Sequence, residues 1–506
     1  MKSVRSLSVM MCAVVSIMLL GDPAFAHQWE SPRKIVVFQR GISGEAQRQI
    51  AAGARARVLH MLPIVNGIAI ELPSGRRAQA LEELRWHSAV FGVYEDHVIT
   101  AAHSSVSITP VETPATEIFP WGVQRIGVPA VVGFLGSKNG PRPRVAVVDT
   151  GIDPKHPDLS GQLAGGYNAR ADENPGSFQD DNGHGTHMAG IIAATANNLG
   201  VIGVASHPAL VAVKVLDHTG HGYLSDLING LQWVLNKGIR VVNMSLSFSE
   251  DSPLLAEVTY KLYQEGVILV ASAGNRCTFT PRGSEANDAG GDDAGGDDAG
   301  GDDAGGDDAG GDDAGGDDAG GDDAGGDDAG GDDAGGDDAG GDDAGGDDAG
   351  GDDWRKVSCD TSLDPLQGGV NYPARYDWVI AVGATDANNQ VTNYSRSGPE
   401  LDVVAPGGTE ASGKILSTTL GRGYGVGAGT SQATAHVTGA VAAVLELAPD
   451  LSVDEVMQLL RRTATDLYYS PELQGAGLIA VDTMVYELLG DGKDANAMDS
   501  TLLGLP

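Results

Sequence analysis

The sequence predicts an α/β protein with a mostly parallel sheet that carries helices on both faces. Several short runs are continuously apolar instead of alternating with polar residues, which is typical of strands covered on both faces. Segments with helical spacing lie between or after these runs, at 226–236 and 433–447. In such sheets ligands bind at the carboxyl ends of the strands. The apolar runs cover residues 145–148, 210–216, 241–246, 267–272 and 378–383.

A smaller α+β unit is expected before this sheet. Its segments alternate between strand-like and helix-like spacing. Residues 100–116, which follow, are rich in Ser, Thr and Pro and are typical of a linker. The expected strands are 34–38, 67–72 and 91–98, and the expected helices are 44–56 and 76–86.

Residues 1–26 are typical of a secretory signal peptide. Lys2 and Arg5 precede an apolar run at 9–20 that is too short to span a bilayer, and residues 24–26, Ala-Phe-Ala, fit a cleavage site. We therefore expect a secreted protein, extracellular, periplasmic or at the cell surface. An uncleaved anchor is the alternative. No later segment is apolar enough over a sufficient length to cross a membrane.

The net charge of -37 is concentrated in one block. Residues 289–353 repeat Ala-Gly-Gly-Asp-Asp thirteen times and hold 26 of the 69 acidic residues. The block has no apolar side chain larger than alanine and its charges repel one another, so we expect a disordered acidic loop. The remaining chain is moderately acidic and has no basic stripe, which excludes a nucleic-acid partner.

Two of the three cysteines flank this block. Cys12 lies in the predicted signal peptide and is removed with it, which leaves Cys277 and Cys359. An even pair in an exported protein indicates a disulfide, and two free thiols are the alternative.

Three glycine-rich segments each place one reactive side chain between a strand and a helix. Asp149 lies in Val-Ala-Val-Val-Asp-Thr-Gly-Ile, His184 in Asn-Gly-His-Gly-Thr-His-Met-Ala-Gly, and Ser431 in Gly-Ala-Gly-Thr-Ser-Gln-Ala. A serine hydroxyl needs a base within hydrogen-bond reach, and that base needs a group that fixes its tautomer. Ser431 begins a predicted helix, so its N–H can stabilise developing negative charge, and Asn275 can add a side-chain donor.

The order Asp, His, Ser along the chain belongs to one of the folds that carry this triad. These segments resemble those of the subtilisin-like (subtilase) serine proteases, and residues 475–479, Gly-Ala-Gly-Leu-Ile, resemble the closing motif of the family. The resemblance implies a serine endopeptidase that forms an acyl-enzyme, with Ser431 as nucleophile, His184 as base, Asp149 as its partner and Asn275 as oxyanion donor. His187 is the rival base, but the family pattern favours the first imidazole.

The resemblance also implies the domain order. The small unit, residues 27–105, resembles the inhibitory, ferredoxin-like propeptide that precedes subtilase catalytic domains and acts as a folding chaperone. Residues 106–489 then form the catalytic domain, interrupted by 289–353, and 490–506 form a tail. We therefore expect a monomeric preproenzyme that processes itself and whose own propeptide is an intramolecular inhibitor. An independent stable domain is the alternative for the small unit.

Substrate-binding residues are also implied by the resemblance. Two strand edges of subtilases pair with the extended peptide substrate. The floor of the main specificity pocket is expected at Asn371. Ser247 departs from the usual glycine, Gln432 from a common Met and Ala435 from a proline. The edge residues here are Gly220, His221, Gly222, Ser245, Leu246 and Ser247.

A structural calcium site is implied in the same way. The side chains of Glu117, Asp158 and Asn197 match ligands of the strong subtilase calcium site, and oxygen ligands from several segments suit calcium. A turn cluster without metal is the alternative. The backbone carbonyls expected to complete the site are those of Thr195, Leu199 and Val201.

Two other classes compete with a secreted protease. One is an inactive relative, and the other is an acidic calcium-binding surface protein on a degenerate protease scaffold. The four reactive positions are filled by competent residues, which favours the enzyme. Hydrolysis of a casein-like protein separates these classes.

Overall fold

A computed structural model describes residues 31–101, 108–135, 142–171, 173–276, 278–281, 354–358 and 369–490. The signal peptide, the acidic repeat, residues 491–506 of the tail and both Cys277 and Cys359 lie outside the described residues. The predictions made for them, the disulfide included, therefore stay predictions. Among the described helices, none has the length and apolarity needed to cross a membrane.

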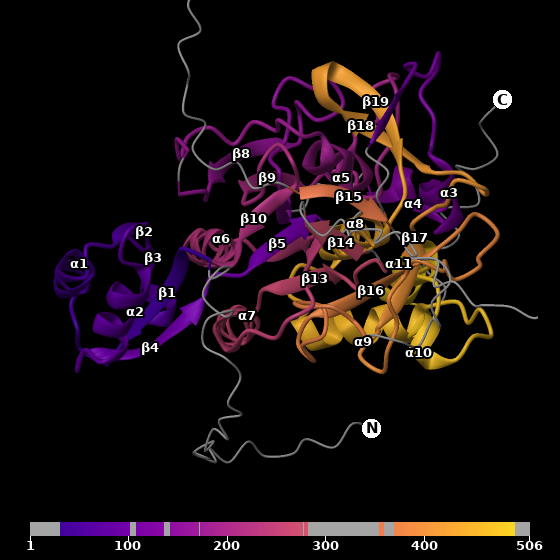
Figure 1. The fold of residues 1–506 in the computed structure, drawn as a ribbon. Coiled ribbons are helices and arrows are strands. Elements are labelled where there is room, and N and C mark those ends of the chain that lie inside the picture. The colour runs from indigo at the N-terminus through magenta and orange to yellow at the C-terminus, as the bar shows by residue number, and fades with distance from the viewer. Residues whose placement is uncertain are drawn as a thin grey trace, which may run out of the picture. The chain divides into compact units, whose positions relative to one another are not determined.

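A seven-stranded sheet forms the centre of the protein, and all its strand pairs are parallel (Figure 1). The sequence prediction of a mostly parallel sheet is therefore confirmed. The strand order is β17-β16-β13-β11-β7-β9-β8. The bounds are β7 Arg144–Asp149, β8 Leu163–Asn168, β9 Ala209–Lys214, β11 Val241–Met244, β13 Ile268–Ser272, β16 Ile380–Thr385 and β17 Val403–Pro406.

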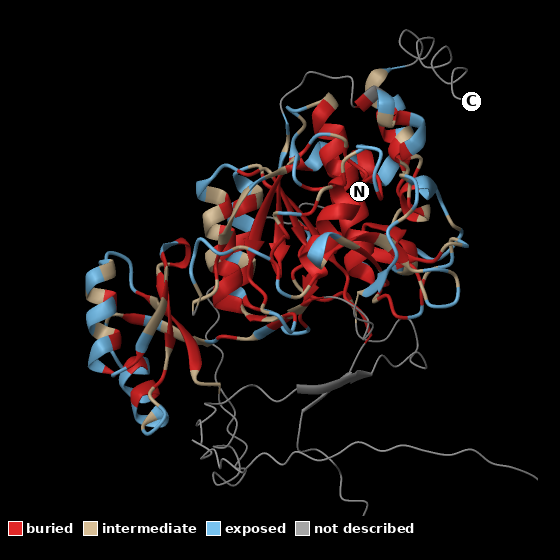
Figure 2. Cartoon of the chain, turned by 90° about the horizontal axis from the view of Figure 1, so that it is seen from above, coloured by how far each residue is buried: buried red, intermediate tan, exposed pale blue. Residues whose placement is uncertain are grey.

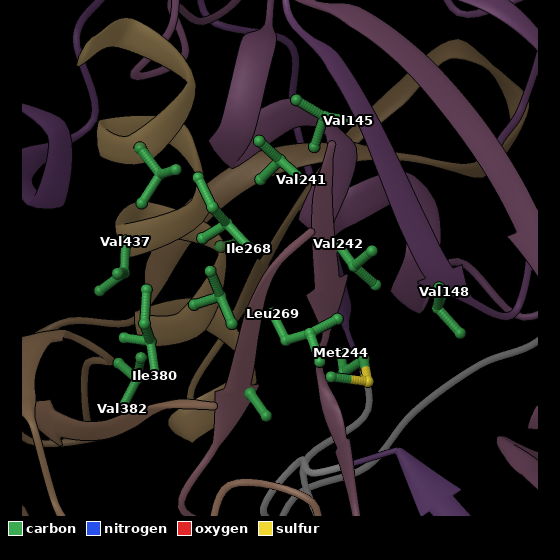
Figure 3. Packing of buried hydrophobic residues seen from close by; sticks show 14 of the residues in the cluster. Val145, Val148, Val241, Val242, Met244, Ile268, Leu269, Ile380, Val382 and Val437 are labelled. Carbon is green, nitrogen blue, oxygen red and sulfur yellow. The ribbon is translucent and has the colours of Figure 1, made fainter. Parts of the chain in front are cut away.

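Apolar side chains on both faces of this sheet explain why the strands read as continuous apolar runs. Val242, Leu269 and Ile380 lie in neighbouring strands and are at most 1% exposed. Figure 3 shows them packed with Val145 and Val437 into one cluster. Burial on both faces holds the sheet rigid, so its carboxyl edge is a fixed platform for polar side chains.

Helices cover the sheet in two layers (Figure 2). Helices α6, Leu224–Asn236, and α7, Pro253–Gln264, pack against each other, and so do α5, His184–Ala193, and α8, Thr430–Leu447. Helix α8 is buried over almost its whole length, because it contacts four strands of the sheet. Five further helices among the described residues complete this part: α3 Trp121–Arg125, α4 Val128–Leu135, α9 Val453–Thr463, α10 Pro471–Gln474 and α11 Val481–Leu489.

The N-terminal unit has its own antiparallel sheet of order β2-β3-β1-β4 and a separate apolar core. The sequence predicted three of its strands and both helices but missed β2. Its elements are β1 Arg33–Phe38, α1 Gly44–Gly53, β2 Arg57–Leu62, the 3-10 turn Pro63–Val65, β3 Gly67–Glu71, α2 Arg77–Arg85 and β4 Val90–Glu95.

The strand that follows this unit joins the main domain instead. Strand β5, Val98–Ala101, lies between β10, His221–Tyr223, and β12, Leu246–Ser247, in an antiparallel sheet of three strands. The prediction of one strand over 91–98 was therefore wrong, since the chain leaves the N-terminal sheet after β4 and enters a second sheet at β5.

A buried ionic cluster joins the N-terminal unit to the start of α6. Asp96 accepts hydrogen bonds from the backbone N and the Oγ of Ser225, each 2.7 Å long. Arg33 donates to Asp96 at 2.9 Å and to Asp226 at 3.3 Å, and His60 Nε2 lies 2.6 Å from Asp226 Oδ1. All five residues are at most 9% exposed, so each charge depends on its partners.

Two smaller strand groups complete the fold. The sheet β18-β19-β6 contains Ile415–Thr419, Gly423–Gly427 and Thr109–Val111, and Leu420–Arg422 form a 3-10 turn between the first two. Strands β14, Thr278–Pro281, and β15, Trp354–Ser358, pair with each other at the two ends of the repeat.

Candidate active site

Asp149 and His184 form a buried pair at the carboxyl edge of the sheet. His184 Nδ1 lies 2.7 Å from Asp149 Oδ1, and the two side chains are 2% and 0% exposed. Asp149 is the last residue of β7 and His184 is the first residue of α5. The sequence prediction that these residues meet is in agreement with the structure.

Glycines allow the strand end and the helix start to approach this closely. Gly183 precedes His184 with φ of 105°, a conformation that other residues rarely adopt. A Cβ on Gly185 would lie 2.1 Å from the carbonyl oxygen of Gly151, so a side chain there would push α5 away from β7. The spacing of glycines in both segments therefore reflects contact between their backbones.

Asp180 organises the loop that carries His184, and the sequence analysis missed it. Its Oδ1 accepts hydrogen bonds from the Thr150 hydroxyl at 2.8 Å and from the Gly183 N–H at 2.9 Å. Its Oδ2 accepts from the N–H and the hydroxyl of Thr186 at 2.9 and 2.6 Å. Asp180 thus ties the residue after Asp149 to both sides of His184.

Lys214 supports the same turn from the neighbouring strand. Its Nζ is buried and donates to the carbonyl oxygens of Thr150 and Leu216, each at 2.8 Å, and to Asp181. The only sequence signals were the placement of Asp180 four residues before His184 and a lysine at the end of an apolar run. Neither signal identifies the partner Thr150, because Thr150 comes from another segment.

The electrostatics favour a protonatable His184 beside a neutral His187. Burial disfavours the charged form of His184, but the Asp149 carboxylate and its hydrogen bond, with a contribution from Asp180, raise the pKa of His184. Burial, reinforced by His184, lowers the pKa of His187 to about 3. His187 Nε2 also lies 3.1 Å from the Gly425 carbonyl oxygen, so His187 is a packed neutral group.

Ser431 lies in the first turn of α8, where backbone N–H groups have no partner within the helix. Its hydroxyl donates to the Ser245 carbonyl at 3.2 Å. Helix α8 begins at Thr430, three residues earlier than predicted. Thr430 donates through its N–H and its hydroxyl to Asn275 Oδ1, at 3.1 and 2.9 Å. These bonds fix the carbonyl end of the Asn275 amide, so its Nδ2 is the donor end.

The predicted substrate-binding residues line the strand β5. Gly222 in β10 pairs with Ile99, and Leu246 in β12 pairs with Ala101. The Ala101 N–H donates to the Gly220 carbonyl at 2.9 Å. The remaining predicted residues, His221, Ser245, Ser247 and Asn371, lie in or beside the same two strand edges.

The predicted calcium ligands also lie together. Glu117 Oε1 accepts from the Asn197 N–H at 2.6 Å, and Asn197 Nδ2 donates to Asp158 Oδ1 at 3.1 Å. Asp158 Oδ2 accepts from the Val201 N–H and the Tyr424 hydroxyl. Nowhere in the part of the chain that the structure describes do three or more His, Cys, Asp or Glu groups form a metal cluster.

The donor set is compatible with a cation that takes oxygen ligands, because the carboxylates of Glu117 and Asp158 both contact the loop at Asn197. The loop includes Thr195 and Leu199, whose carbonyls were predicted to take part. Asn197 Oδ1 accepts from the Leu199 N–H, so its amide would have to turn for Oδ1 to face Asp158.

Comparisons with known proteins agree with this geometry. The profile described as the Subtilase family matches residues 140–295 and 344–477. The chain belongs to the subtilase family. Subtilisin E from Bacillus subtilis is 31% identical over 447 residues, which cover 87% of this chain and 86% of that protein. A thermostable alkaline protease from Halalkalibacterium halodurans is 30% identical over 94% of this chain and 98% of its own. Subtilisin from Bacillus pumilus is 34% identical over 72% and 97%.

Membership in the subtilase family makes the chain a subtilisin-like serine protease, a hydrolase of peptide bonds. The family match extends over both sides of the acidic repeat, so the repeat interrupts one subtilase domain.

We predict that Asp180→Asn shifts the acid limb of peptide hydrolysis to lower pH and lowers kcat/KM about tenfold or more. A base must be neutral to accept a proton. Loss of the Asp180 charge lowers the pKa of His184, so the neutral imidazole persists to lower pH. The profile of kcat/KM against pH, with a neutral peptide, measures this.

Asp181→Asn is the matched control, since Asp181 is adjacent but half exposed and bonds only Lys214 among these groups. A folded Asp180→Asn protein with an unmoved acid limb would contradict the assignment of Asp180.

Proposed function

We propose that the protein is a secreted serine endopeptidase, made as a precursor, that cuts peptide bonds with Ser431, His184 and Asp149. The observation that carries the proposal is the buried hydrogen bond of 2.7 Å between His184 Nδ1 and Asp149 Oδ1. That bond occupies Nδ1, so Nε2 is the nitrogen that remains to take a proton from a serine hydroxyl.

In this mechanism the Ser431 oxygen attacks the peptide carbonyl and its proton passes to His184. Asp149 stabilises the imidazolium cation that forms, and His184 then donates the proton to the leaving amine. Water, deprotonated by the same imidazole, attacks the acyl-enzyme, and His184 then returns that proton to the Ser431 oxygen as the acid product leaves. The elevated pKa of His184 is the thermodynamic expression of that stabilised cation.

The oxyanion of the tetrahedral intermediate is held by two donors. One is the Ser431 N–H in the first turn of α8, and the other is Asn275 Nδ2, which Thr430 orients through the opposite end of the amide. Donors that are fixed before the reaction stabilise charge without reorganisation, and loss of one such donor costs about 3 kcal/mol in the barrier.

The N-terminal unit is proposed to inhibit this site until the precursor is cut. Strand β5 occupies the place between β10 and β12 where an extended peptide would add as a strand. The ionic cluster of Arg33, His60, Asp96 and Asp226 supports the proposed inhibition, because it binds the N-terminal unit to α6. We propose that the same unit also supports folding of the domain that it contacts.

Calcium is proposed to stabilise the loop around Asn197. The carboxylates of Glu117 and Asp158 would hold it together with the oxygen of Asn197 and carbonyls of the same loop, and the bound ion supplies charge that ties three segments together. Its contribution would be to stability, since none of the residues that would hold it is one of the three proposed catalytic residues.

We predict that Ser431→Ala abolishes both peptide hydrolysis and self-cleavage while the fold persists. The loss in kcat should be about a million-fold, the scale measured when a subtilisin loses its catalytic serine. Hydrolysis of a casein-like protein and N-terminal sequencing of the secreted chain measure the two effects. Activity near that of the wild type would overturn the assignment of the triad.

We predict that Asp226→Ala in the full chain shortens the lag before activity at least about tenfold, because it leaves Arg33 without one buried partner. The lag between secretion and peptide hydrolysis is the measurement. Asp377→Ala, at an exposed position, is the control, and equal lags for the two variants would contradict the docking role.

We predict that chelation of calcium lowers the melting temperature of the Ser431→Ala protein. A ligand bound only by the native state, at a hundredfold excess over its Kd, stabilises it by about 2.7 kcal/mol. Glu117→Gln should weaken the response to added calcium. Identical melting of both proteins with and without calcium would exclude the site.

A further inference from the structure

Two backbone segments approach the start of α8 from either side. One is the edge around β12, where the Ser245 carbonyl accepts a hydrogen bond from the Ser431 hydroxyl at 3.2 Å. The other follows β13, where Asn275 Oδ1 accepts from Thr430. We call these the β12 segment, residues 245–248, and the β13 segment, residues 273–275. A side chain that lies between them would therefore be next to a bond held at Ser431.

Asn371 spans the distance between these two segments. Its Nδ2 donates to Ser247 Oγ in the β12 segment at 3.2 Å, and its backbone N–H donates to the Ala273 carbonyl at 2.9 Å. A Cβ added to Gly274 would lie 2.6 Å from Asn371 Nδ2 and 3.0 Å from its Cβ. The Asn371 side chain therefore packs against both segments, and it is 8% exposed.

The far ends of the segments are also fastened. Phe248 and Tyr372 exchange two backbone hydrogen bonds of 3.1 and 3.0 Å, so the residue after Asn371 is pinned to the residue after Ser247. Their rings lie 6.4 Å apart, and Phe248 is 8% exposed. A larger substrate side chain cannot move the β12 and β13 segments apart without breaking these hydrogen bonds, since packed interiors deform little.

The register of β5 identifies which substrate residue meets Asn371. Leu246 pairs with Ala101 and Ser247 with Thr100. In an antiparallel pair, one step forward along a peptide bound like β5 brings its next residue opposite Ser245, beside Ser431. Side chains alternate, so that residue shares a face with Ser247 and points to Asn371. It is the residue directly before the bond to be cut.

We propose that Asn371 restricts this enzyme to peptides with a small side chain, glycine, alanine or serine, directly before the cleaved bond. The inference rests on the proposed function and adds the substrate class of the same site. The sequence carries a consistent feature, because the residue that follows Ala101 is again alanine. A bulky side chain would have to displace Asn371 from Ser247 and Gly274.

The first test uses peptides that differ only in the residue before the cleaved bond, with alanine, phenylalanine or lysine there. The mature wild-type enzyme should cleave the alanine peptide with a kcat/KM at least about tenfold above that of the other two. Equal or faster cleavage of the phenylalanine peptide would overturn the inference and leave the proposed function intact. Failure to cleave any of them would overturn both.

The second test is Asn371→Gly, expressed as the full precursor. It should raise kcat/KM for the phenylalanine peptide at least about tenfold relative to the alanine peptide. Ser247→Ala, which removes the hydrogen bond and little volume, should change that ratio less. An unchanged ratio in Asn371→Gly would overturn the inference.

Asn389→Gly is the matched control, because Asn389 has a φ of 63° that glycine tolerates and lies in the turn after β16. It should keep the wild-type ratio. If Asn371→Gly does not mature, Asn371→Ser replaces it, and the peptide ratio of the wild type decides the inference without any variant.

Discussion

A negative charge buried at the end of β7 governs the arrangement around it. Asp149 is fully buried, and an isolated carboxylate in such a place is very unfavourable unless hydrogen bonds and a positive partner satisfy it. The Thr150 N–H and His184 Nδ1 supply partners for one of its oxygens, since each lies 2.7 Å from Asp149 Oδ1. Thr150 and His184 must therefore be held in place, and neighbouring side chains hold them there.

The holding groups form a second buried layer of charge. Asp180 accepts hydrogen bonds from Thr150 and from Gly183 at the start of α5, and Lys214, in β9, donates a hydrogen bond to the Thr150 carbonyl. Because parallel strands end at one edge, β7 and β9 deliver these groups side by side, as Asp149 and Lys214 are paired in register. The rigid apolar sheet below makes the geometry reproducible from molecule to molecule.

The sequence predicted the sheet because five of its strands are apolar on both faces, a pattern that needs no knowledge of partners. It could not predict β8, whose Leu-Ala-Gly-Gly-Tyr-Asn sequence lies at the sheet edge with little apolar content. The sequence analysis predicted β4 and β5 as one strand. The chain is interrupted between them at Asp96, which accepts a hydrogen bond from the Ser225 N–H at the start of α6, and this contact with a distant helix leaves no local signal. The predicted α8 began three residues late because Asn275 supports Thr430 from another segment.

In the site, too, residues in local patterns were predicted and residues that act through distant contacts were missed. Asp149, His184 and Ser431 were predicted because each lies in a local pattern of glycines. Asp180 and Lys214 were missed because their importance comes from hydrogen bonds to residues from about thirty to over sixty positions away in the chain. Polar contacts between distant residues produce no periodic pattern in the sequence, so periodicity cannot predict them.

Under the proposed inhibitory role of the N-terminal unit, the position of β5 makes protein concentration a control of activity. While the chain is uncut, β5 meets β10 and β12 at an effective concentration set by the tether, in the millimolar range for a short connection, whatever the amount of protein. Once a bond beyond β5 is cut, occupancy depends on the real concentration of the released unit. On that proposal, concentrated protein would stay inhibited after cleavage, and the same molecules would become active on dilution.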